Sequence, residues 1–85
     1  MRVKIFWHSE CPNCPEVKAF GENLIKEGIN VEFWNTKEVD GLAEALFYDI
    51  LATPAVILID GNDRQEWRTN VEVNEIWTTV MKLKT

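Results

Sequence analysis

RVKIFWHSECPNCPEVKAF, residues 2–20, joins two different hydrophobic patterns through a turn that holds both cysteines of the chain. Residues 2–7 alternate and are rich in β-forming side chains, which predicts a strand with Val3 and Ile5 on one face. Beyond the turn, apolar residues recur at helical spacing, at Val17, Phe20, Leu24 and Ile25. The segment therefore predicts a strand, a cysteine-bearing turn and a helix, in that order.

The rest of the chain extends this unit. The helix is expected to end near Gly28, a residue suited to the position after a helix. Further predicted elements are a strand at 31–34, a helix marked by Leu42, Ala45, Leu46 and Ile50 after Asp40-Gly41, a buried strand at 55–59, a hairpin return at 64–68 and a helix marked by Val73, Ile76, Trp77 and Val80. Strands separated by helices predict parallel pairing, and the hairpin predicts one antiparallel pair. We expect one α/β domain over residues 1–85, with order β-α-β-α-β-β-α and helices on both faces of a four-stranded mixed sheet.

Composition excludes several classes of protein. A chain of 85 residues with 46% hydrophobic residues and four tryptophans is expected to fold. Its formal charge of −5 has the wrong sign for a nucleic-acid binder, and no charge block suggests a membrane surface. The apolar stretch near the N-terminus is too short for a signal peptide, so we expect a cytoplasmic protein with reduced thiols. Two cysteines three positions apart close too small a loop to stabilise a fold by chain entropy, which favours a chemical role.

The turn has the chemistry of a reactive thiol. Pro15 has no amide hydrogen, so a regular helix cannot have completed a turn before it. A consistent arrangement makes Asn13 the N-cap, Cys14 the first helical residue and Glu16 the third. Cys11 then lies beside unpaired amides at the positive end of the helix dipole, which favours its thiolate. A stabilisation of about 1.4 kcal/mol would lower the pKa of that thiol by roughly one unit.

The same geometry assigns roles to the two sulfurs. Pro12 stiffens the turn, and the spacing lets Cys14 reach a mixed disulfide formed on Cys11. We therefore predict that Cys11 attacks and Cys14 resolves, with no metal or organic cofactor required. Two alternatives stay open: a metal-binding or delivery module, and a redox-inactive interaction domain. For a zinc site, only His8 and carboxylates could complete the four ligands that such sites normally need.

The chain resembles the thioredoxin-fold superfamily, in the size range of glutaredoxins and over essentially its whole length. The resemblance rests on Cys11-Pro12-Asn13-Cys14 after the first strand and on Thr53-Pro54 before the buried strand AVILI. It implies a cis bond before Pro54 and contact of that segment with the cysteines, where neighbouring backbone pairs with an extended substrate. Trp7 matches a tryptophan common in thioredoxins. The implied substrate-binding residues are Trp7, Pro12, Asn13, Thr53 and Pro54. We expect Trp7 to lie near the sulfurs and to form an apolar patch around Cys11 together with Thr53-Pro54.

Departures from the family pattern narrow the implied activity. Ile5 occupies the position of a buried aspartate that acts as a proton relay in many thioredoxins. The stretches Ala52-Thr53-Pro54 and Trp67-Arg68-Thr69-Asn70 lack the glutathione-binding motif of glutaredoxins. The resemblance therefore implies a thioredoxin-like protein disulfide reductase that acts on protein disulfides and is recharged by an unidentified disulfide reductase. Glutathione is not an expected partner, and we expect a monomer.

Several charged residues have ordinary expectations. His8 is expected to face solvent near a strand end, and Lys18 to occupy a solvated helix position. Glu32 and Glu44 are expected on a solvated acidic surface together with Glu38 and Asp40. Trp34, Trp67 and Trp77 are expected to pack in or against the core.

Overall fold

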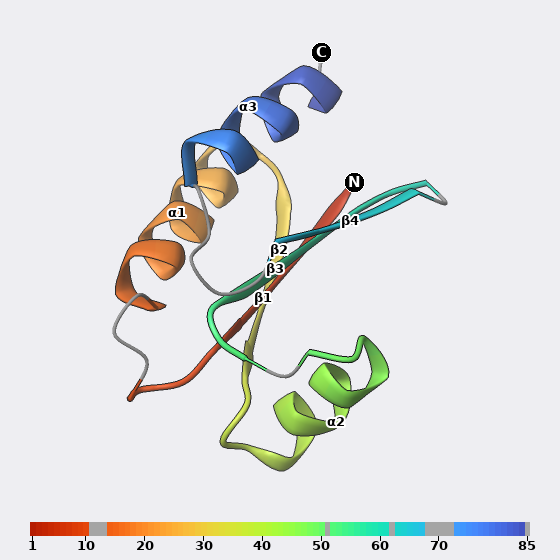
Figure 1. The fold of residues 1–85 in the computed structure, drawn as a ribbon. Coiled ribbons are helices and arrows are strands. Elements are labelled where there is room, and N and C mark those ends of the chain that lie inside the picture. The colour runs from red at the N-terminus through yellow and green to blue at the C-terminus, as the bar shows by residue number, and fades with distance from the viewer. Residues whose placement is uncertain (11–13, 51, 62, 68–72, 85) are drawn as a thin grey trace.

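The structure, a computed structural model, describes residues 1–10, 14–50, 52–61, 63–67 and 73–84. Figure 1 shows the elements, which follow the predicted order. They are β1 (Arg2–Trp7), α1 (Cys14–Lys26), β2 (Asn30–Asn35), α2 (Val39–Phe47), β3 (Ala55–Asp60), β4 (Asp63–Trp67) and α3 (Val73–Lys84). Within these described ranges, no helix has both the length and the apolar content needed to cross a bilayer.

The sheet has the strand order β2-β1-β3-β4 and mixed directions. β1 and β2 are parallel, as predicted, and the β3–β4 hairpin is antiparallel. β3 also pairs antiparallel with β1, so the prediction that every helix-separated pair is parallel was wrong for this strand. The nine residues of α2 span only about 14 Å, less than the roughly 20 Å of a six-residue strand. α2 therefore does not carry the chain back along the sheet, and β3 begins at the edge where β1 ends, with Ala55 opposite Phe6.

Helices cover both faces of the sheet, as predicted: α1 and α3 lie side by side on one face and α2 lies on the other (Figure 1). The alternation of β1 divides its side chains between two cores. Val3 and Ile5 pack with residues of α1 and α3, including Leu24 and Val80, whereas Phe6 packs with Ala45 of α2. Trp34 and Trp77 are half-buried against these cores, as predicted, while the side chain of Trp67 lies outside the description.

α1 ends in a Schellman motif. Gly28 has φ 81°, a left-handed conformation in which glycine is unstrained. Its amide donates to the carbonyl of Ile25 at 2.9 Å, and the amide of Ile29 donates to the carbonyl of Leu24 at 3.1 Å. Ile29 and Leu24 also belong to the same buried cluster. The predicted end of the helix near Gly28 is thus confirmed.

α2 does not bury the face that its leucines predict. Leu42 and Leu46 are exposed, and Ile50 is buried but follows the helix. The buried helical residues are Gly41 and Ala45, four positions apart on one face. A Cβ at position 41 would lie 1.9 Å from the backbone oxygen of Asn35, so the helix approaches the end of β2 as closely as a glycine allows.

Of the predicted acidic surface, Glu38 and Asp40 are exposed as expected, whereas Glu32 and Glu44 are half-buried beside a buried lysine. Lys4 is only 5% exposed on the α2 face of β1. Its ammonium group donates a hydrogen bond to Glu44, lies 3.9 Å from a carboxylate oxygen of Glu32, and sits 4.9 Å from the ring centroid of Tyr48. Glu32 also accepts from Arg2 at 2.9 Å. Glu32 and Glu44 therefore belong to a charge cluster between the sheet and α2, because a buried ammonium needs such partners.

This cluster makes stability depend on pH at both ends of the range. Burial alone would raise the pKa of Glu32, but hydrogen bonding and charge from Arg2 and Lys4 outweigh it and lower the pKa below 4.5. Burial would lower the pKa of Lys4, but its bonds to Glu44 and Tyr48 outweigh it and raise the pKa above 10.5. The contribution of ionised Glu32 to the free energy of unfolding is present above pH 4.5, and it is lost as the pH falls through the lowered pKa that Glu32 has in the folded state. The contribution of protonated Lys4 to the free energy of unfolding is present below pH 10.5, and it is lost as the pH rises through the raised pKa that Lys4 has in the folded state.

We therefore expect the free energy of unfolding, measured by urea titration across pH, to fall at both extremes. Glu32→Gln should flatten the acid limb, because the glutamine cannot lose a proton to gain the charged interaction. Glu22→Gln, on an exposed part of α1, is the matched control and should leave that limb in place. An acid limb unchanged in Glu32→Gln would contradict this account.

Candidate functional site

The candidate site lies where β1 ends and α1 begins. Cys14 is the first residue of α1, as predicted, and is 1% exposed. It is disulfide-bonded in this structure. The other predicted residues of the turn, Cys11, Pro12 and Asn13, lie outside the described residues.

A pocket of about 330 Å³ adjoins Cys14. Its described lining comprises Trp7, His8, Ser9, Cys14, Pro15, Lys18, Ala19 and Glu22. Trp7 is the last residue of β1 and is half-buried. Its carbonyl accepts from the amide of Thr36 at 2.9 Å, which ties this end of β1 to the residue that follows β2. The predicted proximity of Trp7 to a cysteine is therefore found: strand end and helix start share one pocket.

Lys18 has a more specific position than sequence reasoning assigned to it. Its ammonium nitrogen lies 3.8 Å from the ring centroid of Trp7, and the side chain is half-buried. A cation over an indole ring at this distance contributes roughly 0.5–2 kcal/mol, depending on its exposure to water. The sequence feature that pointed to this position was the spacing of Lys18 from Cys14, since residues four apart share a helix face. Lys18 therefore holds Trp7 against α1 and places a positive charge in the cysteine pocket.

The peptide bond between Thr53 and Pro54 is cis, as the resemblance implied. Pro54 is buried directly before β3, and β3 pairs with β1 beginning at Ala55 and Phe6. Thr53 lines a second pocket, of about 290 Å³, together with Thr36, Leu42 and Ile50. Trp7 and Thr53, which were predicted to share one patch, thus line different pockets, and the Pro54 side chain is buried.

His8 borders both pockets. It is half-buried, and its Nδ1 accepts a hydrogen bond from the amide of Glu10 at 3.1 Å. The expectation of a solvent-facing histidine was therefore wrong in part, because the chain turns back after β1 and covers one side of the ring. His8 connects the Trp7 and Thr53 sides of the site.

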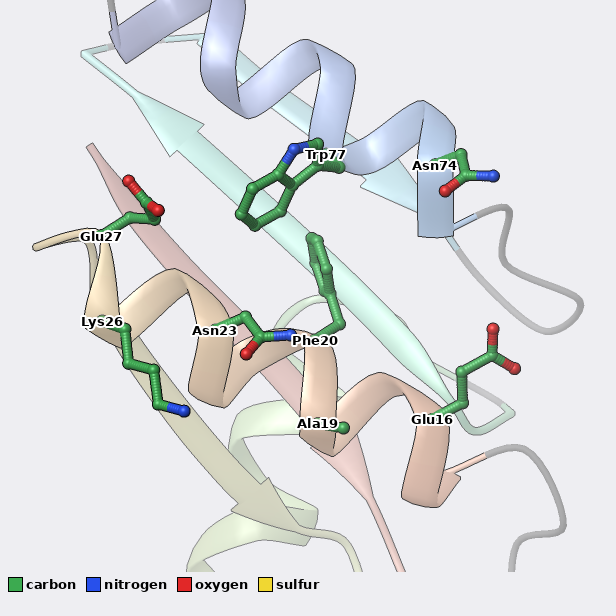
Figure 2. Close-up of a pocket in the computed structure, with 8 residues that line it drawn as sticks. All are labelled: Glu16, Ala19, Phe20, Asn23, Lys26, Glu27, Asn74 and Trp77. Carbon is green, nitrogen blue, oxygen red and sulfur yellow. The ribbon is translucent and has the colours of Figure 1, made fainter.

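A larger hollow, of about 510 Å³, lies between α1 and α3 (Figure 2). Phe20 and Trp77 point toward one another across it, with ring centroids 6.0 Å apart. Its described lining includes neither Cys14 nor Trp7 nor Thr53, and it shares one described residue, Ala19, with the cysteine pocket. Metal ligands do not gather in the described part of the chain either: no three of its His, Cys, Asp and Glu side chains form a group suited to an ion.

The arrangement defines a class of protein. A four-stranded mixed sheet carries two helices on one face and one on the other, with a cysteine at the start of the first helix and a cis proline before the third strand. This is the thioredoxin fold. The chain matches the thioredoxin domain family over residues 1–66 and belongs to that family.

Solved structures agree with this fold. Thioredoxin O2 from Arabidopsis thaliana in the oxidised state superposes with a TM-score of 0.85 at 15% identity, covering 99% of this chain and 75% of that one. Thioredoxin 1 from Thermosipho africanus gives 0.74 at 16% identity, covering 96% and 92%. A thioredoxin-like protein from Clostridium perfringens gives 0.75 at 23% identity, covering 96% and 69%. No curated protein sequence gives a significant match.

Proposed function

We propose that the protein is a thiol–disulfide oxidoreductase that reduces protein disulfides through Cys11 and Cys14. The observation that carries the proposal is a buried, disulfide-bonded Cys14 at the start of α1 in a chain of the thioredoxin domain family. A bulky substrate cannot readily reach the side chain of a residue that is 1% exposed, so Cys14 suits the second, internal step. Cys11 is then the attacking thiolate.

The reaction proceeds by two exchanges. The Cys11 thiolate attacks one sulfur of the substrate disulfide, the substrate S–S bond breaks, and its other sulfur leaves as a thiolate. Cys14 loses its proton and attacks the Cys11 sulfur of the mixed disulfide, which releases the second substrate thiolate. Solvent and Cys14 supply the two protons that the substrate gains. Two electrons have then passed to the substrate, and a disulfide reductase must return two to the protein.

The surrounding residues have binding and positioning roles in this proposal. Trp7, held by Lys18, offers an apolar surface beside the cysteine pocket. Pro12, Asn13, Thr53 and Pro54 supply the backbone and turn against which an extended substrate segment rests. We place this activity in the cytoplasm, with a monomer that uses neither glutathione, metal nor organic cofactor.

An equilibrium redox titration in metal-free buffer tests the proposal. We expect one reversible two-electron transition near the thioredoxin value of about −270 mV. Fluorescence should report it, because Trp7 shares a pocket with Cys14. Trp7→Phe should remove most of the fluorescence change while thiol labelling gives the same potential. If no reversible intramolecular disulfide forms, the proposal fails, and tight stoichiometric zinc or copper(I) binding would favour a metal module instead.

A further inference from the structure

The outward face of α2 is apolar over two turns. Four large hydrophobic residues are exposed there: Val39 (83%), Leu42 (49%), Leu46 (61%) and Phe47 (75%). Their spacing of three, four and one positions puts them on one side of the helix, and we call this set the α2 stripe. Isolated exposed hydrophobic residues are ordinary, whereas a contiguous set on one helix face indicates a surface that another molecule covers.

Folding does not explain the α2 stripe. The side of α2 that meets β2 and the sheet carries Gly41 and Ala45, which are buried. In Figure 1, α2 lies alone on its face of the sheet, and α1 and α3 are on the opposite face. No described element therefore lies over the α2 stripe. Because Gly41 and Ala45 face the sheet, the opposite side of α2, with the stripe, faces solvent.

The α2 stripe reaches the candidate site. Leu42 lines the 290 Å³ pocket together with Thr53 and His8. Thr53 precedes the buried Pro54, and His8 also borders the cysteine pocket. A protein that rests on the stripe would thus extend along this pocket toward the sulfur chemistry.

The charges around the α2 stripe select the partner. Glu38 and Asp40 are exposed at the start of the helix, and we call this pair the acidic rim. The neighbouring Lys37 lies 3.7 Å from Glu10, which offsets its charge. With a net charge of −5, a second copy of this chain would meet the acidic rim with charge of the same sign. Lysine or arginine around an apolar segment would complement the rim.

We propose that the α2 stripe is a docking surface for the protein that exchanges disulfides with this chain, and that this partner presents an apolar segment flanked by lysine or arginine. The proposal rests on the proposed function, because it names the substrate class of the same site. Docking on α2 adds binding energy remote from the reacting sulfurs, so it discriminates between protein disulfides that are chemically alike.

Two peptides test the proposal directly. Both carry the same disulfide and the same leucine-containing segment, flanked by lysine in one and by glutamate in the other. We expect the lysine peptide to bind about tenfold more tightly, measured by fluorescence anisotropy on versions with serine in place of cysteine. Its disulfide version should be reduced with a correspondingly higher kcat/KM. The preference should shrink as salt is added, because the rim charges are exposed.

Matched variants locate the effect. Val39→Gln/Leu46→Gln should weaken binding of the lysine peptide about tenfold, since two apolar contacts are lost. The same double variant should reduce bis(2-hydroxyethyl) disulfide, a small substrate without a docking segment, at the wild-type rate. Ile25→Gln is the control: this residue is 48% exposed on α1, on the other face of the sheet, and its replacement should change neither readout. Glu38→Lys/Asp40→Lys should reverse the preference between the peptides.

The outcomes separate the two proposals. Equal binding of both peptides, in a protein that reduces bis(2-hydroxyethyl) disulfide, would overturn the docking surface alone. Preferential binding that depends on the stripe, in a protein that reduces no disulfide, would overturn the proposed function and its substrate class and leave only a binding surface. A wild-type dimer in sedimentation that Val39→Gln/Leu46→Gln dissociates would overturn the docking partner in favour of a second copy.

Discussion

Gly41→Ala is expected to destabilise the fold by about 2 kcal/mol or more, although alanine is the better helix former. The added Cβ would lie 1.9 Å from the backbone oxygen of Asn35 and 2.5 Å from its carbonyl carbon. Backbone atoms cannot turn away as a side chain can, so α2 or the end of β2 must move. Replacing glycine by alanine stabilises a helix by only about 1 kcal/mol, which is less than the expected cost of the overpacking.

Gly21→Ala is the matched control for this prediction, because it also replaces a buried glycine within a helix. Its Cβ would meet side-chain atoms, Cδ1 of Ile5 at 2.5 Å and the ring of Phe33 at 2.8 Å, and these can shift. We expect urea unfolding to rank Gly41→Ala as clearly less stable than Gly21→Ala. The reverse order would mean that α2 moves away from β2 more easily than two core side chains adjust.

The damage should extend to the site. Asn35 pairs with Trp7 across β1 and β2, and the next residue, Thr36, donates its amide to the carbonyl of Trp7. A displaced Asn35 therefore disturbs the strand end that holds Trp7 beside Cys14. The fluorescence response of Trp7 to oxidation should weaken in Gly41→Ala even under conditions where the protein stays folded.

The sequence predicted the elements better than it predicted their arrangement. The alternation of residues 2–7 and the glycine at 28 are local signals, and the structure bears both out. The direction of β3 depends on the edge of the sheet at which the chain emerges from the nine-residue α2. The residues of β3 themselves carry no signal for that direction. The buried face predicted for α2 was right for Ala45, which is buried, but wrong for Leu42 and Leu46, which are exposed because close approach to Asn35 requires Gly41 to face inward.

The candidate site shows the same division. The helix start at Cys14 followed from the position of Pro15, whereas the cis bond before Pro54 was implied by the family resemblance. The nearness of Trp7 to Cys14 was also predicted. The contact of Lys18 with Trp7 was missed, because helix spacing gives the face of a residue but not the strand end that this face meets. Lys4 was missed for a similar reason: one lysine in an alternating strand is ordinary until carboxylates from two other elements surround it.

The largest effect on activity is expected from the cysteines. Cys14→Ser should stop turnover at the mixed disulfide, because the internal thiol that releases the substrate is missing. A reacting group held nearby has an effective concentration far above that of thiols in solution, so steady-state reduction should fall by at least about a hundredfold. The trapped species should consist of one protein and one substrate joined through Cys11, visible by mass spectrometry without reductant.

Cys11→Ser should trap nothing, and its reduction of disulfides should be equally low. The asymmetry follows from exposure: Cys14 as a residue is 1% exposed, so we do not expect it to take over the attack on a protein disulfide. Cys11→Ser/Cys14→Ser gives the background for both measurements. Trapping through Cys14 in the Cys11→Ser variant would mean that the buried thiol is reached first, and the two roles would then be exchanged. We expect both serine variants to fold. A variant that traps no mixed disulfide has therefore lost the thiol that reacts, and its failure to trap is not caused by unfolding of the domain.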